Sequence, residues 1–203
     1  SPGSSGSAAS TAANAGSTSA SAQAGTWTVG SDSVVGYRVR EQLGGVSALT
    51  DAVGRTSSVT GEATIEPSGS SLRVTKASFE ADLTTLKSDR TMRDNRIRTM
   101  GLESATYPKA TFVLTEPIDV PAAALTGSTV DVTLNGDLTI HGVTRRVAIP
   151  AQARLANGRV EVTGSLTFPF ADFGMTPPNV AGFVSVENDA TLEFLVALDK
   201  ATA

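Results

Sequence analysis

The sequence predicts an all-β protein, an antiparallel barrel of about eight strands with one short helix that covers an end or a side. The main observation is that Val, Leu, Ile or Gly occupies every second position from Val130 to Ile140. Such alternation is typical of a long strand with one buried face. A turn at His141-Gly142, followed by renewed alternation from Val143, makes this segment a hairpin. Long strands with one apolar face are typical of barrels, whose interior is either a packed core or a container for an apolar ligand.

Length and composition fit a single all-β domain and exclude several kinds of site. The chain has 203 residues, no cysteine, one histidine and a net charge of −4. Without cysteine there can be no disulfide or thiolate metal site, and one histidine excludes a multi-histidine metal centre. The negative charge gives no reason to expect nucleic acid as a partner. No apolar run approaches the roughly 18 residues that a membrane-spanning helix needs.

The first 25 residues consist almost entirely of serine, alanine, glycine and threonine. Such a segment buries too little apolar surface to offset the entropy of ordering, so residues 1–25 are predicted to be a disordered linker. A linker of this length would span roughly 25–30 Å and would suit the tethering of an extracytoplasmic domain near a membrane. The alternative is a floppy terminus that includes residues added by cloning. The folded barrel domain is expected to cover residues 26–203.

Alternating apolar residues predict the strands of the first half of the domain. These strands lie near residues 27–29, 35–39, 59–67 and 72–83. Residues 43–54 contain three glycines and are predicted to be an irregular loop. In the strand over 72–83 the apolar residues move from even to odd positions, which predicts a β-bulge near residues 76–78.

The second half contains the remaining strands and the one predicted helix. The strands lie near residues 111–118, 130–140, 143–149, 160–170 and 192–198. Residues Ser88–Thr99 show no alternation and contain neither glycine nor proline. Ser88 can cap a helix, and Asp89 in the first turn favours a helix N-terminus. A short helix is therefore expected over Ser88–Thr99.

The predicted helix and its flanks carry a cluster of positive charge. Five basic and two acidic residues lie between positions 87 and 98 of a chain that is negative overall. Guanidinium groups at a cavity mouth suit a phosphate, pyrophosphate or carboxylate. Arg90, Arg93 and Arg96 are therefore candidates for binding a ligand head group. The alternative is a solvated helix whose arginines pair with nearby acids and carbonyl groups.

The aromatic and large aliphatic residues on the inner faces of the strands are candidates for lining a ligand cavity. They are Phe79, Leu83, Phe112, Leu134, Leu138, Ile140, Phe168, Phe170, Phe183 and Phe194. The alternative is that these side chains interdigitate into a solid core, because proteins normally pack to high density. A solid barrel would suit a surface module that binds a protein partner.

His141 is the one candidate for acid–base chemistry. A catalytic triad would need a nucleophile and an orienting carboxylate beside it, and a histidine in a hairpin turn is more typical of a residue bonded to the backbone. The sequence contains no phosphate-binding glycine loop, zinc motif or nucleophile elbow. We therefore expect no catalytic residue, no metal site and no enzymatic activity, with a lipid enzyme that uses His141 as the alternative.

Several segments, taken together and in order, resemble the YceI family of lipocalin-like proteins. They are Trp27-Thr28-Val29, Arg93-Asp94, Tyr107-Pro108 with Thr111-Phe112, the segment from Gly136 to Thr144, and Phe170 to Met175. The resemblance covers residues 26–199, which is essentially the whole predicted domain. It departs from the family at Val53-Gly54-Arg55-Thr56, where members often carry a Gly-x-Phe element.

The resemblance implies an eight-stranded antiparallel barrel with a helical cover and an elongated apolar interior. Members of the family are thought to hold long amphiphilic lipids, such as polyisoprenoids and isoprenoid quinones, and are mostly periplasmic or secreted. It therefore implies extracytoplasmic binding, storage or transport of an amphiphilic lipid, with a bound polyisoprenoid in place of any cofactor. Long apolar strands also make a homodimer an expectation to test.

Overall fold

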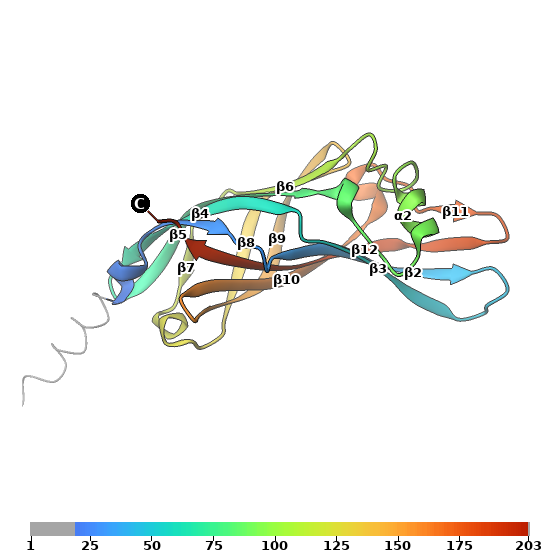
Figure 1. Ribbon diagram of the computed structural model, residues 1–203. Helices are drawn as coiled ribbons and strands as arrows, with labels where there is room; N and C mark the ends of the chain where they lie inside the picture. Colours follow the sequence, from blue (N-terminus) through green and yellow to red (C-terminus); the bar gives the residue numbers. More distant parts are fainter. Residues whose placement is uncertain (1–18, 203) are drawn as a thin grey trace, which may run out of the picture.

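The structure, a computed structural model, describes residues 19–202, and its body is a closed antiparallel barrel of eight strands (Figure 1). The barrel strands, in pairing order, are β1 (Gly25–Val29), β4 (Val59–Ser68), β5 (Ser71–Asp82), β6 (Lys109–Leu114), β8 (Val130–Ile140), β9 (Val143–Ala156), β10 (Arg159–Pro169) and β12 (Val184–Lys200). Pairing of β1 with the last residues of β12 closes the ring. The predicted barrel is therefore confirmed.

One end of the barrel carries an extension built on the first half of β12. There β12 pairs with β2 (Val34–Leu43), which pairs with β3 (Leu49–Thr56), while β11 (Asn179–Val180) folds back on the start of β12. The helix α2 (Thr91–Ile97) lies at this end, beside the two projecting hairpins (Figure 1). The remaining short elements are η1 (Leu83–Thr85), β7 (Ile118–Val120), η2 (Ala122–Thr126) and η3 (Phe170–Phe173).

The strand β8 has the two faces that its sequence predicts. Leu138 and Ile140 are buried on the even face, whereas Asp131 and Thr133 on the odd face are exposed. At the end of the strand, His141 and Gly142 both have positive φ angles, 54° and 72°, as a tight two-residue turn into β9 requires. The predicted hairpin is therefore confirmed.

The predicted bulge lies in β5, one residue before the expected range. Thr64 pairs with Lys76 and Ile65 with Val74, so Thr75 is the extra residue on β5. A bulge reverses the parity of a strand, because two residues then oppose one on the partner. As a result the apolar residues on both sides of Thr75 face the barrel interior.

Two local predictions were wrong. Residues 43–54 are not a loop, because β2 continues to Leu43 and β3 begins at Leu49. The helix α2 begins at Thr91 and not at Ser88, and its N-cap residue Arg90 makes no capping hydrogen bond through its side chain. The N–H and hydroxyl groups of Ser88 instead donate to Asp94 Oδ1, at 2.9 and 2.6 Å, which pulls the preceding segment away from helical geometry.

The barrel end opposite α2 is closed by the residues that precede β1. Residues 19–23 form a helical turn in which Ala20 is fully buried, and Trp27 Nε1 donates a hydrogen bond of 2.9 Å to the Gln23 carbonyl oxygen. Lys200 Nζ donates to the Ala22 carbonyl oxygen at 2.6 Å. This part of the predicted linker thus belongs to the folded domain, and residues 1–18 lie outside the described residues. No helix within residues 19–202 is long and apolar enough to cross a membrane.

Candidate functional site

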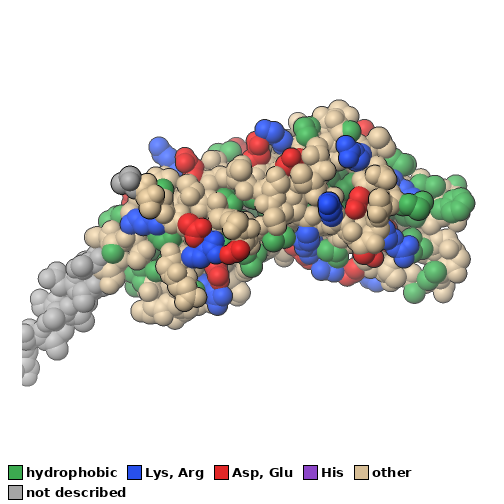
Figure 2. Space-filling view, viewed as in Figure 1, with side chains coloured by type: hydrophobic (Ala, Val, Ile, Leu, Met, Phe, Trp, Pro, Cys, Tyr) green, Lys and Arg blue, Asp and Glu red, His purple; other side chains and the backbone are tan. Residues whose placement is uncertain are grey.

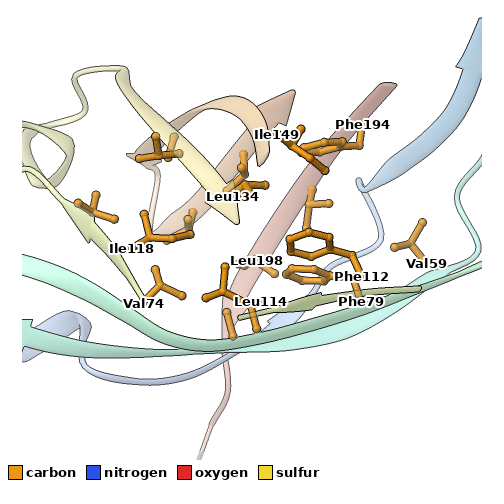
Figure 3. Close-up of a pocket in the computed structure, with 18 of the residues that line it drawn as sticks. Val59, Val74, Phe79, Phe112, Leu114, Ile118, Leu134, Ile149, Phe194 and Leu198 are labelled. Carbon is orange, nitrogen blue, oxygen red and sulfur yellow. The ribbon is translucent and has the colours of Figure 1, made fainter. Parts of the chain in front are cut away.

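The barrel is hollow, and its inner chamber lies toward the end closed by Trp27. This chamber has a volume of about 150 Å³, and its wall is almost entirely apolar. Figure 3 shows side chains from several strands pointing into it, with Phe79 and Phe112, cross-strand partners on β5 and β6, lying side by side. Thr111 and Arg154 are the polar residues among those that line it. Burying an apolar chain against this wall is favourable, because apolar area leaves water. A water molecule in the chamber would find few hydrogen-bond partners.

A second, outer chamber lies beneath α2 and has a volume of about 120 Å³. Its wall combines apolar residues with a set of polar ones. The polar or charged residues that line it are Tyr37, Glu41, Thr56, Arg93, Arg96 and Thr191. The two chambers share three lining residues, Val35, Ala110 and Leu192, so they adjoin along the barrel axis. Both chambers are therefore walled mainly by apolar side chains, and most of the polar lining residues lie at the end that α2 covers.

Glycines in the strands help keep this interior open. Several inward aromatic rings lie across a glycine of a neighbouring strand so closely that a β-carbon there would overlap the ring. A β-carbon at Gly61 would be 2.7 Å from a ring carbon of Phe79, and one at Gly164 would be 2.6 Å from a ring carbon of Phe194. A ring that lies flat over a glycine stays close to the wall and leaves the barrel axis free. With a large side chain in place of the glycine, the ring would be pushed toward the axis.

Tyr37 brings an unpaired hydroxyl group into the outer chamber. Its oxygen is buried, and it has no hydrogen-bond partner among the residues that the structure describes. Burial raises the pKa of this phenol to about 12, and the nearby Arg93 opposes the shift only in part. A buried hydroxyl without a partner costs free energy, which a ligand oxygen in the outer chamber would recover by accepting a hydrogen bond.

Arg93 is held in place by acids and is not a free cation. Its side chain and that of Glu41 are 9% and 4% exposed, and they form an ion pair that faces the outer chamber. Asp89, four residues earlier, binds the same guanidinium group from the solvent side. The hydrogen bond to Arg93 holds the pKa of the Asp89 carboxyl below its usual range. This group of three anchors α2 to β2 across the barrel mouth.

The three head-group candidates thus occupy different positions. Arg96 lines the outer chamber and, among residues 19–202, forms no ion pair. Arg93 also lines it but is neutralised by Glu41 and Asp89. Arg90 is exposed and does not line either chamber. Arg96 is therefore the cation best placed to meet an anionic group.

Nine of the ten predicted cavity residues line a chamber. The inner chamber is lined by Phe79, Phe112, Leu134, Leu138 and Phe194, and the outer chamber by Leu83, Ile140, Phe168 and Phe170. The inward position predicted for Phe183 is wrong, because this residue lies in the turn between β11 and β12, past the end of the barrel, and is 71% exposed. Whether the nine touch a ligand stays a prediction.

His141 joins two loops outside the chambers. Its Nε2 lies 2.6 Å from Glu103 Oε2, and its ring centroid is 4.1 Å from that of Tyr107. His141 and Glu103 both have positive φ angles. These contacts fix the β8–β9 turn against the loop that follows α2. Among residues 19–202 no group of His, Asp and Glu residues is arranged to hold a metal ion.

Sequence reasoning missed Tyr37 and Glu41 as residues of the outer chamber. Tyr37 was visible as an inward residue of an alternating strand, and Gly54 opposite it was the signal that an aromatic ring could cover the wall there. Glu41 follows the same odd-numbered face of β2. A buried acid at that point could have been matched to a basic helix, but the sequence alone does not show which elements meet.

The comparisons with known proteins agree on one family. A family model described as a YceI-like domain matches residues 27–198. A UPF0312 protein of Vibrio parahaemolyticus serotype O3:K6 is 31% identical over 119 residues, which are 55% of this chain and 59% of that protein. The matched part thus spans less than two thirds of that relative.

Solved structures share the barrel at low sequence identity. A polyisoprenoid binding domain from Saccharophagus degradans, implicated in plant cell wall breakdown, has a TM-score of 0.62 and 18% identity, covering 88% of this chain and 100% of its own. BcnA of Burkholderia cenocepacia has a TM-score of 0.55 and 20% identity, covering 82% and 96%. A YceI protein of Campylobacter jejuni has a TM-score of 0.52 and 16% identity, covering 69% and 81%. At these identities the likeness concerns the fold.

Proposed function

Because this chain belongs to the YceI-like domain family, we propose that its barrel binds a long amphiphilic lipid, a polyisoprenoid or an isoprenoid quinone. The tail lies in the inner chamber, and the head group lies in the outer chamber under α2. The observation that carries this proposal is an apolar interior whose polar and charged lining residues gather mainly at the α2 end. The similarity to a polyisoprenoid binding domain supports the same ligand class.

The size of the chambers sets how the tail fits. A cavity of about 150 Å³ in a protein core holds a benzene ring, so each chamber accommodates about six carbons. With the head group in the outer chamber, the inner chamber in its present form holds about one isoprene unit of the tail. A longer tail displaces side chains at the junction formed by Val35, Ala110 and Leu192. Each methylene that leaves water contributes about 0.8 kcal/mol, which offsets a modest rearrangement of the wall.

The polar groups of the outer chamber select the head group. The Tyr37 hydroxyl donates to an oxygen of the head group, such as a quinone carbonyl or a phosphate ester. Arg96 adds a charge-assisted bond when the head is anionic. The buried ion pair of Arg93 and Glu41 is internally balanced and shapes the mouth. These groups hold charge and position a ligand without activating a nucleophile, so we propose binding without catalysis.

Storage or transport of the lipid outside the cytoplasm, with the N-terminal segment as a tether, is part of the proposal. The alternative of a protein-interaction module with a solid core conflicts with the two chambers.

A homodimer stays a prediction. Sedimentation velocity of the full chain checks it.

Extraction and thermal unfolding test the proposed function. Mass spectrometry of an organic extract of the purified protein is expected to find a stoichiometric amphiphile. After its removal, added polyprenyl phosphate is expected to raise the midpoint of thermal unfolding, since a ligand that binds only the folded state stabilises it. Inorganic phosphate, which lacks a tail, is the control and is expected to raise the midpoint far less. The absence of both the extracted amphiphile and the shift in midpoint would overturn the proposal.

A further inference from the structure

Two hairpin tips lie side by side at the α2 end of the molecule. One is the turn between β2 and β3, residues 44–48, and the other is the turn between β11 and β12, residues 181–183. The Gly44 N–H donates to the Phe183 carbonyl oxygen at 2.7 Å, and Leu43 pairs with Val184. We refer to these two turns and Leu49 as the double tip. Both hairpins project beyond the barrel at the α2 end (Figure 1).

The double tip is apolar and free of charge. Residues 43–50 and 173–186 contain no charged side chain. Phe183 is 71% exposed, Val46 47% and Leu49 38%, and Figure 2 shows hydrophobic side chains gathered at this end of the molecule. Single exposed apolar residues are ordinary, but three on adjacent turns without a charge between them mark an interaction surface.

Positive charge lies on one side of the base of this surface, on the α2 segment. The loop after α2 meets the β11 segment, since a β-carbon at Gly101 would be 2.8 Å from Pro178 Cγ. This contact places the basic α2 segment next to the double tip. Arg90 and Arg98 in that segment are exposed and, among the residues described, form no ion pair. At this end of the molecule, guanidinium groups without an ion-pair partner in the described part of the chain therefore lie behind the apolar double tip.

We propose that the double tip docks into the surface of an anionic lipid bilayer. The apolar side chains enter the boundary between head groups and acyl chains, while the arginines meet the lipid phosphates. This charge complementarity distinguishes a bilayer from an apolar protein groove as the occupant. Pro178 and Val184, at the base of the tip, line the outer chamber, so docking brings the chamber to the bilayer. The docking goes beyond the proposed function and does not depend on which ligand the chambers hold.

Sedimentation with lipid vesicles tests the docking. The full chain is mixed with vesicles of phosphatidylcholine, with and without phosphatidylglycerol, and binding is expected mainly to the anionic vesicles. Phe183→Ser is expected to weaken binding about tenfold or more, because it removes the most exposed apolar side chain of the double tip from the bilayer. Val113→Ser is the matched control, because Val113 is 48% exposed on β6, and it is expected to bind like the unaltered chain.

A second variant tests the charge. The double substitution Arg90→Gln and Arg98→Gln is expected to weaken binding to anionic vesicles about tenfold or more, since each cation near an anionic surface contributes about 1 kcal/mol. Binding of the unaltered chain to neither kind of vesicle would overturn the docking, as would an equal loss in Val113→Ser. The docking would also be overturned if the unaltered chain were a dimer and Phe183→Ser dissociated the dimer without changing vesicle binding. The double tip would then join two copies of the chain. Circular dichroism confirms that each variant is folded.

Discussion

The ring of Tyr37 lies across the backbone of Gly54, its partner on β3, so closely that a β-carbon at residue 54 would be 2.3 Å from Tyr37 Cε1. Gly54→Ala therefore pushes the ring and its hydroxyl out of position in the outer chamber. The expected cost is about 1–3 kcal/mol of unfolding free energy, the usual range for overpacking. Urea denaturation measures this cost.

A double-mutant cycle supplies the control for this contact. In a Tyr37→Leu background, the smaller and more flexible side chain can give way, so Gly54→Ala is expected to cost much less. An equal cost in both backgrounds would show that the glycine is needed for a reason other than the ring.

The raised pKa of Tyr37 predicts a loss of stability at high pH. The folded protein keeps this phenol neutral up to about pH 12, whereas in the unfolded chain it ionises near 10. Between these values the unfolded state binds fewer protons, so stability falls as pH rises from about 10 to 12, by an amount on the order of 2 kcal/mol. Denaturation of the unaltered chain and of Tyr37→Phe across this range measures the difference.

The chain has two tyrosines, so absorbance also reports the titration. The phenolate signal of Tyr37 is expected near pH 12 and should be missing in Tyr37→Phe. A folded variant with the same alkaline stability curve as the unaltered chain would contradict the assignment.

The ion pair between Arg93 and Glu41 predicts strong coupling. Arg93→Met leaves Glu41 buried without its partner, and breaking a buried pair in this way costs about 3–5 kcal/mol. Adding Glu41→Gln should recover much of that loss in urea denaturation. Arg146→Met, which breaks the exposed pair with Asp137, is the control and is expected to cost less than about 1 kcal/mol. Equal costs for the two single variants would contradict the structural role of the buried pair.

Arg96 predicts how affinity depends on head-group charge. Arg96→Gln is expected to lower affinity for a polyprenyl phosphate roughly 10- to 100-fold, since hydrogen bonds to charged groups contribute about 1.5–3 kcal/mol. Affinity for a quinone with the same tail should change little. Calorimetric titration measures both, with the exposed Arg146→Gln on β9 as control. If the quinone were affected as strongly, Arg96 would support the chamber rather than bind the head group.

The period of the apolar residues predicted most of the barrel, and its failures have physical causes. Alternation identified the β8–β9 hairpin and the change of parity in β5, because one buried face imposes that pattern on any strand. Gly54 is typical of a loop in the sequence, yet it lies in β3 because the ring of Tyr37 on the neighbouring strand fills the space that a side chain at residue 54 would need. The prediction that Phe183 faces the interior is wrong because a pattern of apolar residues does not show where the barrel ends.

The contents of the barrel were harder to predict than its walls. The sequence left open whether the inward residues meet in a solid core. The answer depends on which glycines lie under which rings, and therefore on the register of the paired strands, which alternation alone does not show. The pairing of Arg93 with Glu41, 52 residues earlier, is a fact of the same kind. That Arg96 has no ion-pair partner among the described residues could be recognised only once the partners of Arg93 were known.

The junction between the chambers offers the most direct test of lipid binding along the barrel axis. Ala110 lines both chambers, so Ala110→Leu narrows the passage between them. Ala148→Leu, on the exposed face of β9, is the matched control. Calorimetry is performed with amphiphiles that share a phosphate head and carry tails of one, two and three isoprene units. The affinity of the unaltered chain and of Ala148→Leu is expected to rise with tail length, while that of Ala110→Leu stops rising once the outer chamber is full. An equal rise in all three proteins, or no binding to the unaltered chain, would contradict the account.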